Sequence, residues 1–165
     1  MTDNSSTLGP VRLWPYLILA ALVLTADGIS KQLALNYLSL YQPLPVFPGL
    51  NLRLAFNTGA AFSFLHDAGG WQRWFFIGLS TMVSLALLVW IRRSQNQPLL
   101  FRIALAMIAG GAIGNVIDRL IYGHVIDFID VYYANWHWPA FNVADSAIVI
   151  GALVIVWVTW GEKDD

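Results

Sequence analysis

The sequence contains no cysteine and few charged residues. Without a thiol, the chain cannot form a disulfide, a cysteine nucleophile, a zinc ribbon or an iron–sulfur cluster. Charged residues make up 12% of the 165 residues and hydrophobic residues 58%, whereas an average soluble domain has about 25% charged residues. The net charge of -1 and the lack of a long basic run argue against a nucleic-acid partner. We therefore expect lipid to surround most of the chain, and the eight Trp residues agree, because Trp gathers at membrane interfaces.

Four uncharged hydrophobic runs indicate membrane-spanning helices. The runs cover residues 13–26, 74–91, 103–117 and 146–161. A helix needs about 20 residues to cross a hydrocarbon core of about 30 Å, and three of the runs are shorter than this. We therefore predict longer helices over residues 12–38, 71–91, 99–121 and 142–160. These helices carry Asp27, Asp118 and Asp145 to the membrane boundary. Arg12 precedes the first run as in a signal peptide, but three further runs follow, so we expect a retained helix in one polytopic membrane domain over residues 1–165.

Basic residues predict how the helices are oriented. Arg92, Arg93 and Arg102 cluster in the short link between the second and third runs, which predicts a cytoplasmic link and two cytoplasmic termini. The ends of the helices that carry acidic residues then share the outer face. Six of the ten acidic residues lie on that side, namely Asp27, Asp67, Asp118, Asp127, Asp130 and Asp145.

Two segments between the runs have the character of β-strands. Residues 50–57 alternate, with Leu50, Leu52, Leu54 and Phe56 on one side. Residues 124–133 are rich in β-branched and aromatic side chains. We therefore predict an all-α membrane fold of four transmembrane helices with a small extracytoplasmic β platform.

The first helix and the loop after it contain two polar groupings. Asp27 and Lys31 are four residues apart, so they share one helix face, and we interpret them as a structural ion pair that neutralises itself. The sequence from Asn57 to Gly59 is typical of a tight turn, which is its simplest interpretation when it is taken alone.

The third helix combines small residues with polar ones. Ala106, Gly110 and Gly114 recur at four-residue spacing, which favours close approach of a neighbouring helix. Polar side chains follow on nearly the same face, namely Asn115, Asp118 and Arg119. Their hydrogen-bonding groups are suited either to binding a substrate backbone or to bracing other side chains.

Asp127 and Asp145 are candidates for a catalytic pair. Asp127 lies among hydrophobic residues, where a lone carboxylate is costly unless it has a partner. Asp145 follows Asn142 by three residues at the start of the fourth helix, an arrangement close to a capping box. The helix dipole by itself would also favour an acidic residue at this position. Two adjacent carboxylates share a proton, so one acts as acid while the other activates water. A structural carboxylate network is the alternative.

A metal site has less support in the sequence. His124, His137, Asp127 and Asp130 have the right chemistry for metal ligands, but their spacing matches no compact motif. We interpret His137, which lies between two Trp residues, as an interfacial residue, and we expect neither a metal nor a cofactor.

Five short motifs, taken together and in order, resemble the lipoprotein signal peptidase family, also called signal peptidase II. They are residues 27–31 (DGISK), 57–62 (NTGAAF), 110–119 (GGAIGNVIDR), 125–128 (VIDF) and 141–145 (FNVAD). The resemblance implies that Asp127 and Asp145 are the catalytic aspartates. It implies a surrounding substrate pocket formed by Asn57, Gly59, Asn115, Arg119, Asn142 and Ala144. It also implies supporting roles for Asp27, Lys31 and Asp118.

By the same resemblance, the protein is a membrane aspartic endopeptidase. It would remove the signal peptide from diacylglyceryl-modified prolipoproteins by cleaving on the N-terminal side of the lipidated Cys. We expect it in the bacterial inner membrane, in contact with lipid and substrate, with its active site at the periplasmic face and with no obligate protein partner. Gly28 departs from the family, which often has Gln there, and we expect this difference to alter local packing.

Two other classes of protein remain as alternatives. A small proton-coupled transporter would place acidic residues along a path through the bilayer, whereas these carboxylates crowd one end. A non-enzymatic membrane scaffold would use the polar groups only to hold helices together.

Overall fold

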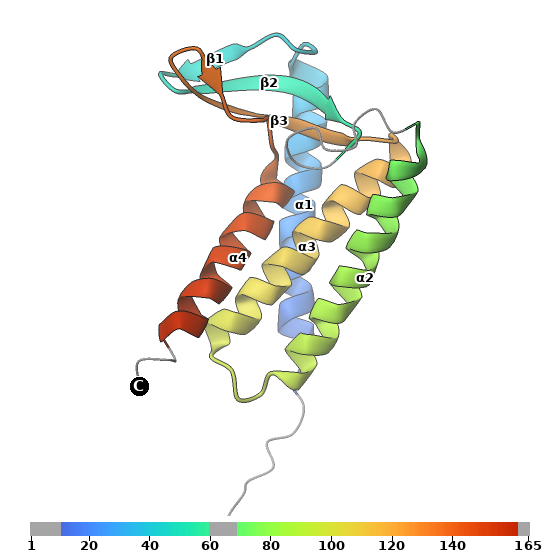
Figure 1. Cartoon of the computed structure of the whole chain (residues 1–165), viewed down its shortest axis with the longest axis vertical. Helices are drawn as coiled ribbons and strands as arrows, with labels where there is room; N and C mark the ends of the chain where they lie inside the picture. Colours follow the sequence, from blue (N-terminus) through green and yellow to red (C-terminus); the bar gives the residue numbers. More distant parts are fainter. Residues whose placement is uncertain (1–10, 60–68, 162–165) are drawn as a thin grey trace, which may run out of the picture.

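The computed structural model describes residues 11–59 and 69–161. Residues 60–62 of the second motif, Asp67 and the two terminal tails lie outside the described residues. Within the described part, four helices are long and apolar enough to cross a membrane, as the hydrophobic runs predicted. The helices are α1 (Trp14–Tyr37), α2 (Trp71–Arg93), α3 (Leu99–Ile121) and α4 (Val143–Gly161). They form an elongated bundle (Figure 1).

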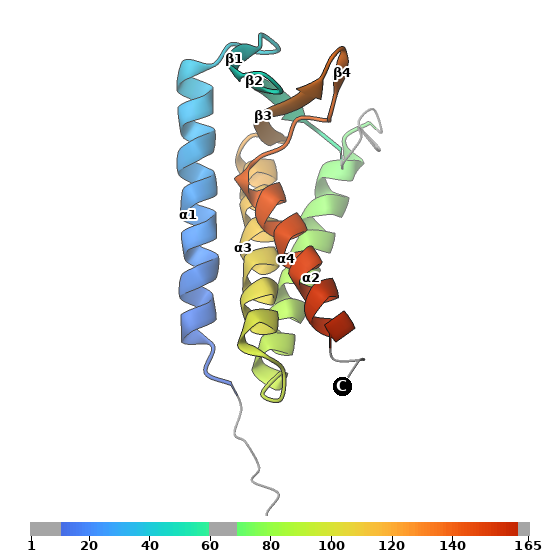
Figure 2. The same cartoon turned by 90° about the vertical axis from the view of Figure 1, so that its left-hand side faces the viewer.

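Helix α3 is the centre of the bundle. It contacts each of the other three helices and is the most buried of the four (Figure 2). A Cβ atom at Gly110 would lie 2.7 Å from the backbone oxygen of Ala20 in α1, and one at Gly111 would clash with the backbone oxygen of Ala144 in α4. Glycine is therefore needed at both positions for the backbones to approach this closely. The sequence pattern predicted the contact at Gly110 but not the one at Gly111.

The small sheet lies across one end of the bundle (Figures 1 and 2). Its strands are antiparallel in the order β1 (Leu44–Phe47), β2 (Leu50–Asn57), β3 (Val125–Tyr133) and β4 (Trp136–His137). Strands β2 and β3 correspond to the two predicted segments, whereas the short outer strands β1 and β4 were not predicted. The register pairs Ala55 with Asp127 and Asn51 with Asp130. It therefore places both acidic residues of β3 opposite β2.

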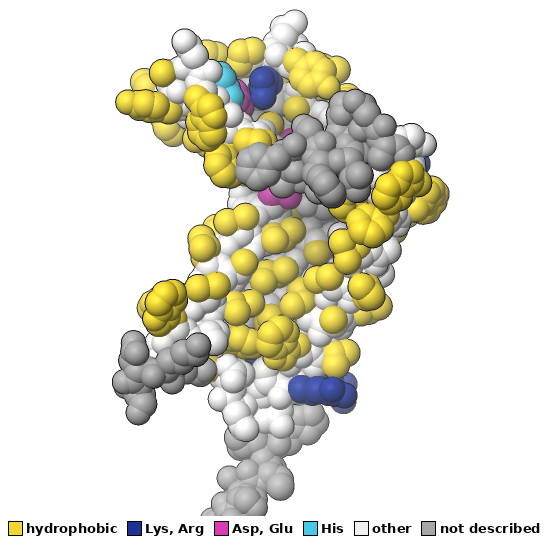
Figure 3. Space-filling model, in the orientation of Figure 1, with side chains coloured by type: hydrophobic (Ala, Val, Ile, Leu, Met, Phe, Trp, Pro, Cys, Tyr) yellow, Lys and Arg dark blue, Asp and Glu magenta, His cyan; other side chains and the backbone are white. Residues whose placement is uncertain are grey.

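The rest of the surface fits a lipid environment. Large hydrophobic side chains on the outer faces of the helices are exposed, among them Leu22, Leu85, Leu153 and Trp157. In the view of Figure 3, hydrophobic atoms cover much of the helical part of the molecule. Polar side chains are instead buried where the helices meet the sheet, and this junction contains the candidate site.

Candidate active site

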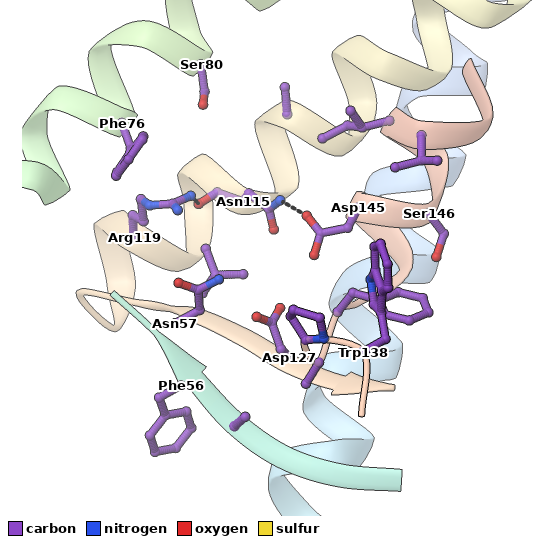
Figure 4. Close-up of a pocket in the computed structure, with 18 of the residues that line it drawn as sticks. Phe56, Asn57, Phe76, Ser80, Asn115, Arg119, Asp127, Trp138, Asp145 and Ser146 are labelled. Carbon is purple, nitrogen blue, oxygen red and sulfur yellow. Dashed lines mark hydrogen bonds between the residues drawn. The ribbon is translucent and has the colours of Figure 1, made fainter. Parts of the chain in front are cut away.

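Asp127 and Asp145 face the same cavity at the junction of bundle and sheet. Asp127 lies on β3 and is only 2% exposed, while Asp145 lies in the first turn of α4 and is partly exposed. The cavity has a volume of about 1040 Å³, and both side chains line it. Figure 4 shows the two carboxylates pointing toward one another. The fold thus brings together two acidic residues that are 18 positions apart in the sequence.

Two asparagine side chains connect the carboxylates. The Nδ2 of Asn115 donates to Asp145 Oδ1 at 2.8 Å, and the Nδ2 of Asn142 donates to Asp127 Oδ1 at 2.7 Å. Asn142 also lies 3.3 Å from Asn115 Oδ1, so the two amides belong to one network. The backbone N–H of Asp145 donates to Asn142 Oδ1 at 2.9 Å, and the backbone N–H of Asn142 donates to Asp145 Oδ2 at 3.3 Å. This reciprocal cap fixes Asp145 at the start of α4, as the spacing predicted.

The environment of Asp127 favours the protonated carboxyl. Burial, followed by the charge of Asp145, raises the pKa of Asp127 from 3.8 to about 7. Hydrogen bonds from Asn57 and Asn142 and the charge of Lys31 oppose this shift but are outweighed. The site can therefore hold a proton near neutral pH, as a pair of carboxylates in acid–base chemistry requires.

Lys31 lies behind the carboxylates and connects several elements. Its Nζ is 2.6 Å from Asp27 and 2.8 Å from Asp118, and it donates to Asn115 Oδ1 at 3.2 Å. Asp27 in turn accepts a hydrogen bond at 2.9 Å from the backbone N–H of Ala144. The interpretation of Asp27 and Lys31 as a self-contained pair was therefore wrong. Lys31 thus links α1 to α3 through Asp118, and its partner Asp27 links α1 to the start of α4 through Ala144.

Arg119 forms another wall of the cavity. Its Nη2 donates to the backbone oxygen of Gly59 at 2.7 Å, and its Nη1 donates to that of Asn115 at 3.3 Å. The guanidinium also stacks over the ring of Phe76, 5.1 Å from the centroid. The backbone N–H of Gly59 donates to Asn57 Oδ1 at 3.0 Å, which forms the predicted turn. This turn holds both the Asn57 side chain and the Gly59 carbonyl in place beside Arg119.

The predicted site residues fall into two layers. Those that line the cavity are Asn57, Asn115, Arg119, Asp127 and Asp145. Those that lie behind this layer, in contact with it or with one another, are Asp27, Lys31, Gly59, Asp118, Asn142 and Ala144. Other lining residues were not predicted, including Tyr41, Arg53, Phe76 and Trp138. The strand alternation contained a signal for Arg53, because it places Arg53 on the same side of β2 as Asn57.

The four residues considered for a metal site do not all come together. His137 Nδ1 lies 2.8 Å from Asp130 Oδ1, so His137 is more than the interfacial residue that its Trp neighbours suggested. His124 packs instead against Phe56, with 4.2 Å between ring centroids. No group of three His or acidic residues that could hold a metal occurs among residues 11–59 and 69–161.

We expected Gly28, where the sequence departs from the family, to alter local packing, and the structure does not support this. Gly28 is exposed on α1, and a Cβ atom there would meet no heavy atom within 4 Å. The position faces open space, so its identity has no effect on the packing around the site.

The fold and the site define a polytopic membrane protein whose paired carboxylates are suited to acid–base chemistry. The family model described as signal peptidase (SPase) II matches residues 19–160. The chain therefore belongs to the signal peptidase II family and is a protease.

Relatives and solved structures agree with this assignment. The chain is 54% identical to a lipoprotein signal peptidase of Polynucleobacter necessarius over 142 residues, which cover 86% of each chain. It is 50% identical to a lipoprotein signal peptidase of Ectopseudomonas mendocina, over 86% of this chain and 85% of the relative. Two solved bacterial membrane enzymes share the fold. The first has a TM-score of 0.82 and 27% sequence identity, over 94% of this chain and 93% of the solved chain. The second has a TM-score of 0.76 and 29% sequence identity, over 90% of this chain and 94% of the solved chain.

Proposed function

We propose that the protein is an aspartic endopeptidase with Asp127 and Asp145 as its catalytic pair. It removes the signal peptide from diacylglyceryl-modified prolipoproteins by cleaving on the N-terminal side of the lipidated Cys. The substrate class is supported by the relatives, which are named lipoprotein signal peptidase. The aspartic mechanism is supported by one observation above all, the two carboxylates that face each other across a cavity at the end of the bundle.

In the proposed reaction, water is the nucleophile. The ionised member of the pair takes a proton from water, whose oxygen attacks the peptide carbonyl, while the protonated member donates to the carbonyl oxygen. Collapse of the tetrahedral intermediate breaks the C–N bond, and a proton from the pair passes to the leaving amine. Asn57 and Arg119, which line the same cavity, are placed to orient and polarise the carbonyl. The pKa of about 7 at Asp127 keeps a proton available to the pair near neutral pH.

The position of the cavity suits a substrate that crosses a membrane. Its helical walls include hydrophobic side chains, among them Phe76 of α2 and Ile148 and Val149 of α4. Its other wall is the sheet, which contributes Asn57 and Asp127. A signal peptide that lies along the helices would bring its cleavage site to the sheet end of the bundle, and the attached lipid would hold the cleavage site at that depth.

We also propose that the protein lies in the bacterial inner membrane, with both termini cytoplasmic and the cavity at the periplasmic face. Arg92 and Arg93 support this orientation because they are exposed in the part of the bundle farthest from the sheet. The chain has no native Cys, so single-Cys variants test the orientation directly. A membrane-impermeant thiol reagent should label Asn135→Cys, on the sheet, in intact spheroplasts. It should label Asn96→Cys, in the α2–α3 link, only after permeabilisation; the opposite pattern would reverse the orientation.

The catalytic proposal is tested with purified protein in detergent and a diacylglyceryl-modified prolipoprotein. Asp127→Asn and Asp145→Asn should each lower turnover by about 10²–10⁴-fold, the usual contribution of acid–base catalysis, and should still bind substrate. Asp130→Asn is the matched control, since it removes another buried carboxylate of β3 and should retain measurable turnover. An unlipidated substrate should be cleaved poorly. Wild-type turnover by either folded dyad variant would refute the aspartic mechanism.

A further inference from the structure

Arg53 is a cationic side chain in the cavity that the proposed mechanism does not use. It lies on β2, on the side that also carries Ala55 and Asn57, and all three residues line the cavity together with Asp127. The Arg53 side chain is 28% exposed. Its Nε is buried and has no hydrogen-bond partner among the described residues. The Nε of Arg119, the other arginine of the cavity wall, also has no hydrogen-bond partner among the described residues, but its Nη1 and Nη2 donate to two backbone carbonyls.

The nearest acidic group to Arg53 has shorter contacts with other residues. Asp130 is fully buried and lies 3.8 Å from Arg53 Nη2, too far for a hydrogen bond. It accepts a hydrogen bond from Asn51 Nδ2 at 3.1 Å and lies 2.8 Å from His137 Nδ1, whose ring stacks on Tyr132. Asp130 therefore attracts Arg53 by charge, and within residues 11–59 and 69–161 the guanidinium donates no hydrogen bond to it. In Figure 3, basic, acidic and His atoms are seen together over the sheet, above further acidic atoms.

The position of Arg53 indicates which part of a substrate it would meet. The helices line the cavity with Phe76, Ile148 and Val149 along with Arg119 and Asp145, and Arg53 lines it from the sheet. If the signal peptide lies along the helices, as the proposed function requires, the residues after the lipidated Cys must leave over the sheet. These residues would then pass Arg53.

We infer that Arg53 is a specificity-determining residue that binds an acidic side chain among the first residues after the lipidated Cys. A guanidinium presents a planar fork of N–H donors that matches a carboxylate, and a partly buried site strengthens the pair. This inference rests on the proposed function.

The test uses diacylglyceryl-modified peptides that differ at one position. Asp, Asn or Lys is placed at the second, third or fourth residue, counting the lipidated Cys as the first. For each peptide, kcat/KM is measured with the wild type, Arg53→Gln and Arg53→Lys. Arg93→Gln is the control, because it removes an exposed arginine far from the cavity. Thermal unfolding of each variant shows that it is folded.

At one position, the wild type should prefer Asp over Asn by about tenfold, the lower end of the contribution of a hydrogen bond to a charged group. Lys at that position should be the poorest substrate. Arg53→Gln should reduce the Asp-to-Asn ratio to about 1, Arg53→Lys should keep part of it, and Arg93→Gln should keep all of it.

Two results would overturn the inference while leaving the proposed function intact. One is a wild type that cleaves the Asp and Asn peptides equally at all three positions, and the other is an unchanged preference in Arg53→Gln. Failure of the wild type to cleave any peptide in a competent assay would overturn the proposed function and this inference with it.

Discussion

Asp127→Asn should lower turnover strongly and yet gain stability relative to the wild type as pH rises from 5 to 8. A carboxyl whose folded pKa is raised contributes stability that is fully present below its unfolded pKa, here 3.8, and is lost as pH rises through about 7. Each pH unit in this window corresponds to about 1.4 kcal/mol. Between pH 5 and pH 8, Asp127 therefore lowers the free energy of unfolding of the wild type by about 2.5 kcal/mol. Asn has no such titration, so the variant should gain this amount relative to the wild type.

The comparison of the two pH values cancels effects that do not depend on pH. Asn has one acceptor oxygen where Asp has two, so it accepts fewer hydrogen bonds from Asn57 and Asn142, but that loss does not depend on pH. About 2.5 kcal/mol corresponds to roughly 5–10 °C in Tm for a chain of this size. The assay is the apparent Tm in detergent, followed by Trp fluorescence at both pH values for the wild type and Asp127→Asn.

Asp130→Asn is the control, because the pKa of Asp130 is lowered whereas that of Asp127 is raised. Burial alone would raise the pKa of Asp130, but hydrogen bonds from His137 and Asn51 and the charge of Arg53 outweigh it and lower the pKa. The stability from Asp130 is therefore present above pH 3.8 and lost only as pH falls through the lowered value. Asp130 is ionised at both pH 5 and pH 8, so its own titration adds no difference in stability between them, and Asp130→Asn should be destabilising at both. The reasoning is refuted if the Tm difference between Asp127→Asn and the wild type is equal at the two pH values.

Three further predictions follow from the same geometry. Because the proposed mechanism needs one proton on the pair, kcat/KM should fall as pH rises above about 7, the pKa of Asp127, and a flat profile to pH 9 would contradict this. Gly110→Ala should lower the free energy of unfolding by about 1–3 kcal/mol, since its Cβ would meet the α1 backbone at 2.7 Å. Gly28→Ala is the control: it faces open space and should leave the Tm unchanged or raise it. Lys31→Met should cost about 3–5 kcal/mol by leaving two buried carboxylates without their cation, and an unchanged Tm would contradict this.

Local patterns in the sequence predicted the elements better than the contacts between them. The four hydrophobic runs predicted the helices because the length needed to cross a membrane is a property of one segment. Alternation predicted β2, but β1 and β4 are short and exposed and form only by pairing with strands already in place. The four-residue spacing of Asp27 and Lys31 predicted their ion pair, whereas Asp118, the third member, comes from another helix.

The sequence alone determined that most of the chain is solvated by lipid and that its chemistry cannot use thiols, because composition decides both. It also restricted the candidates for a pair, by placing Asp127 among hydrophobic residues and Asp145 at a helix start. Only the tertiary structure decided that the two face one cavity, that Arg53 shares it, and that the pKa of Asp127 is about 7. The physical reason is that burial and electrostatic interactions depend on distances in space, and these are set by how β2, β3, α3 and α4 pack together.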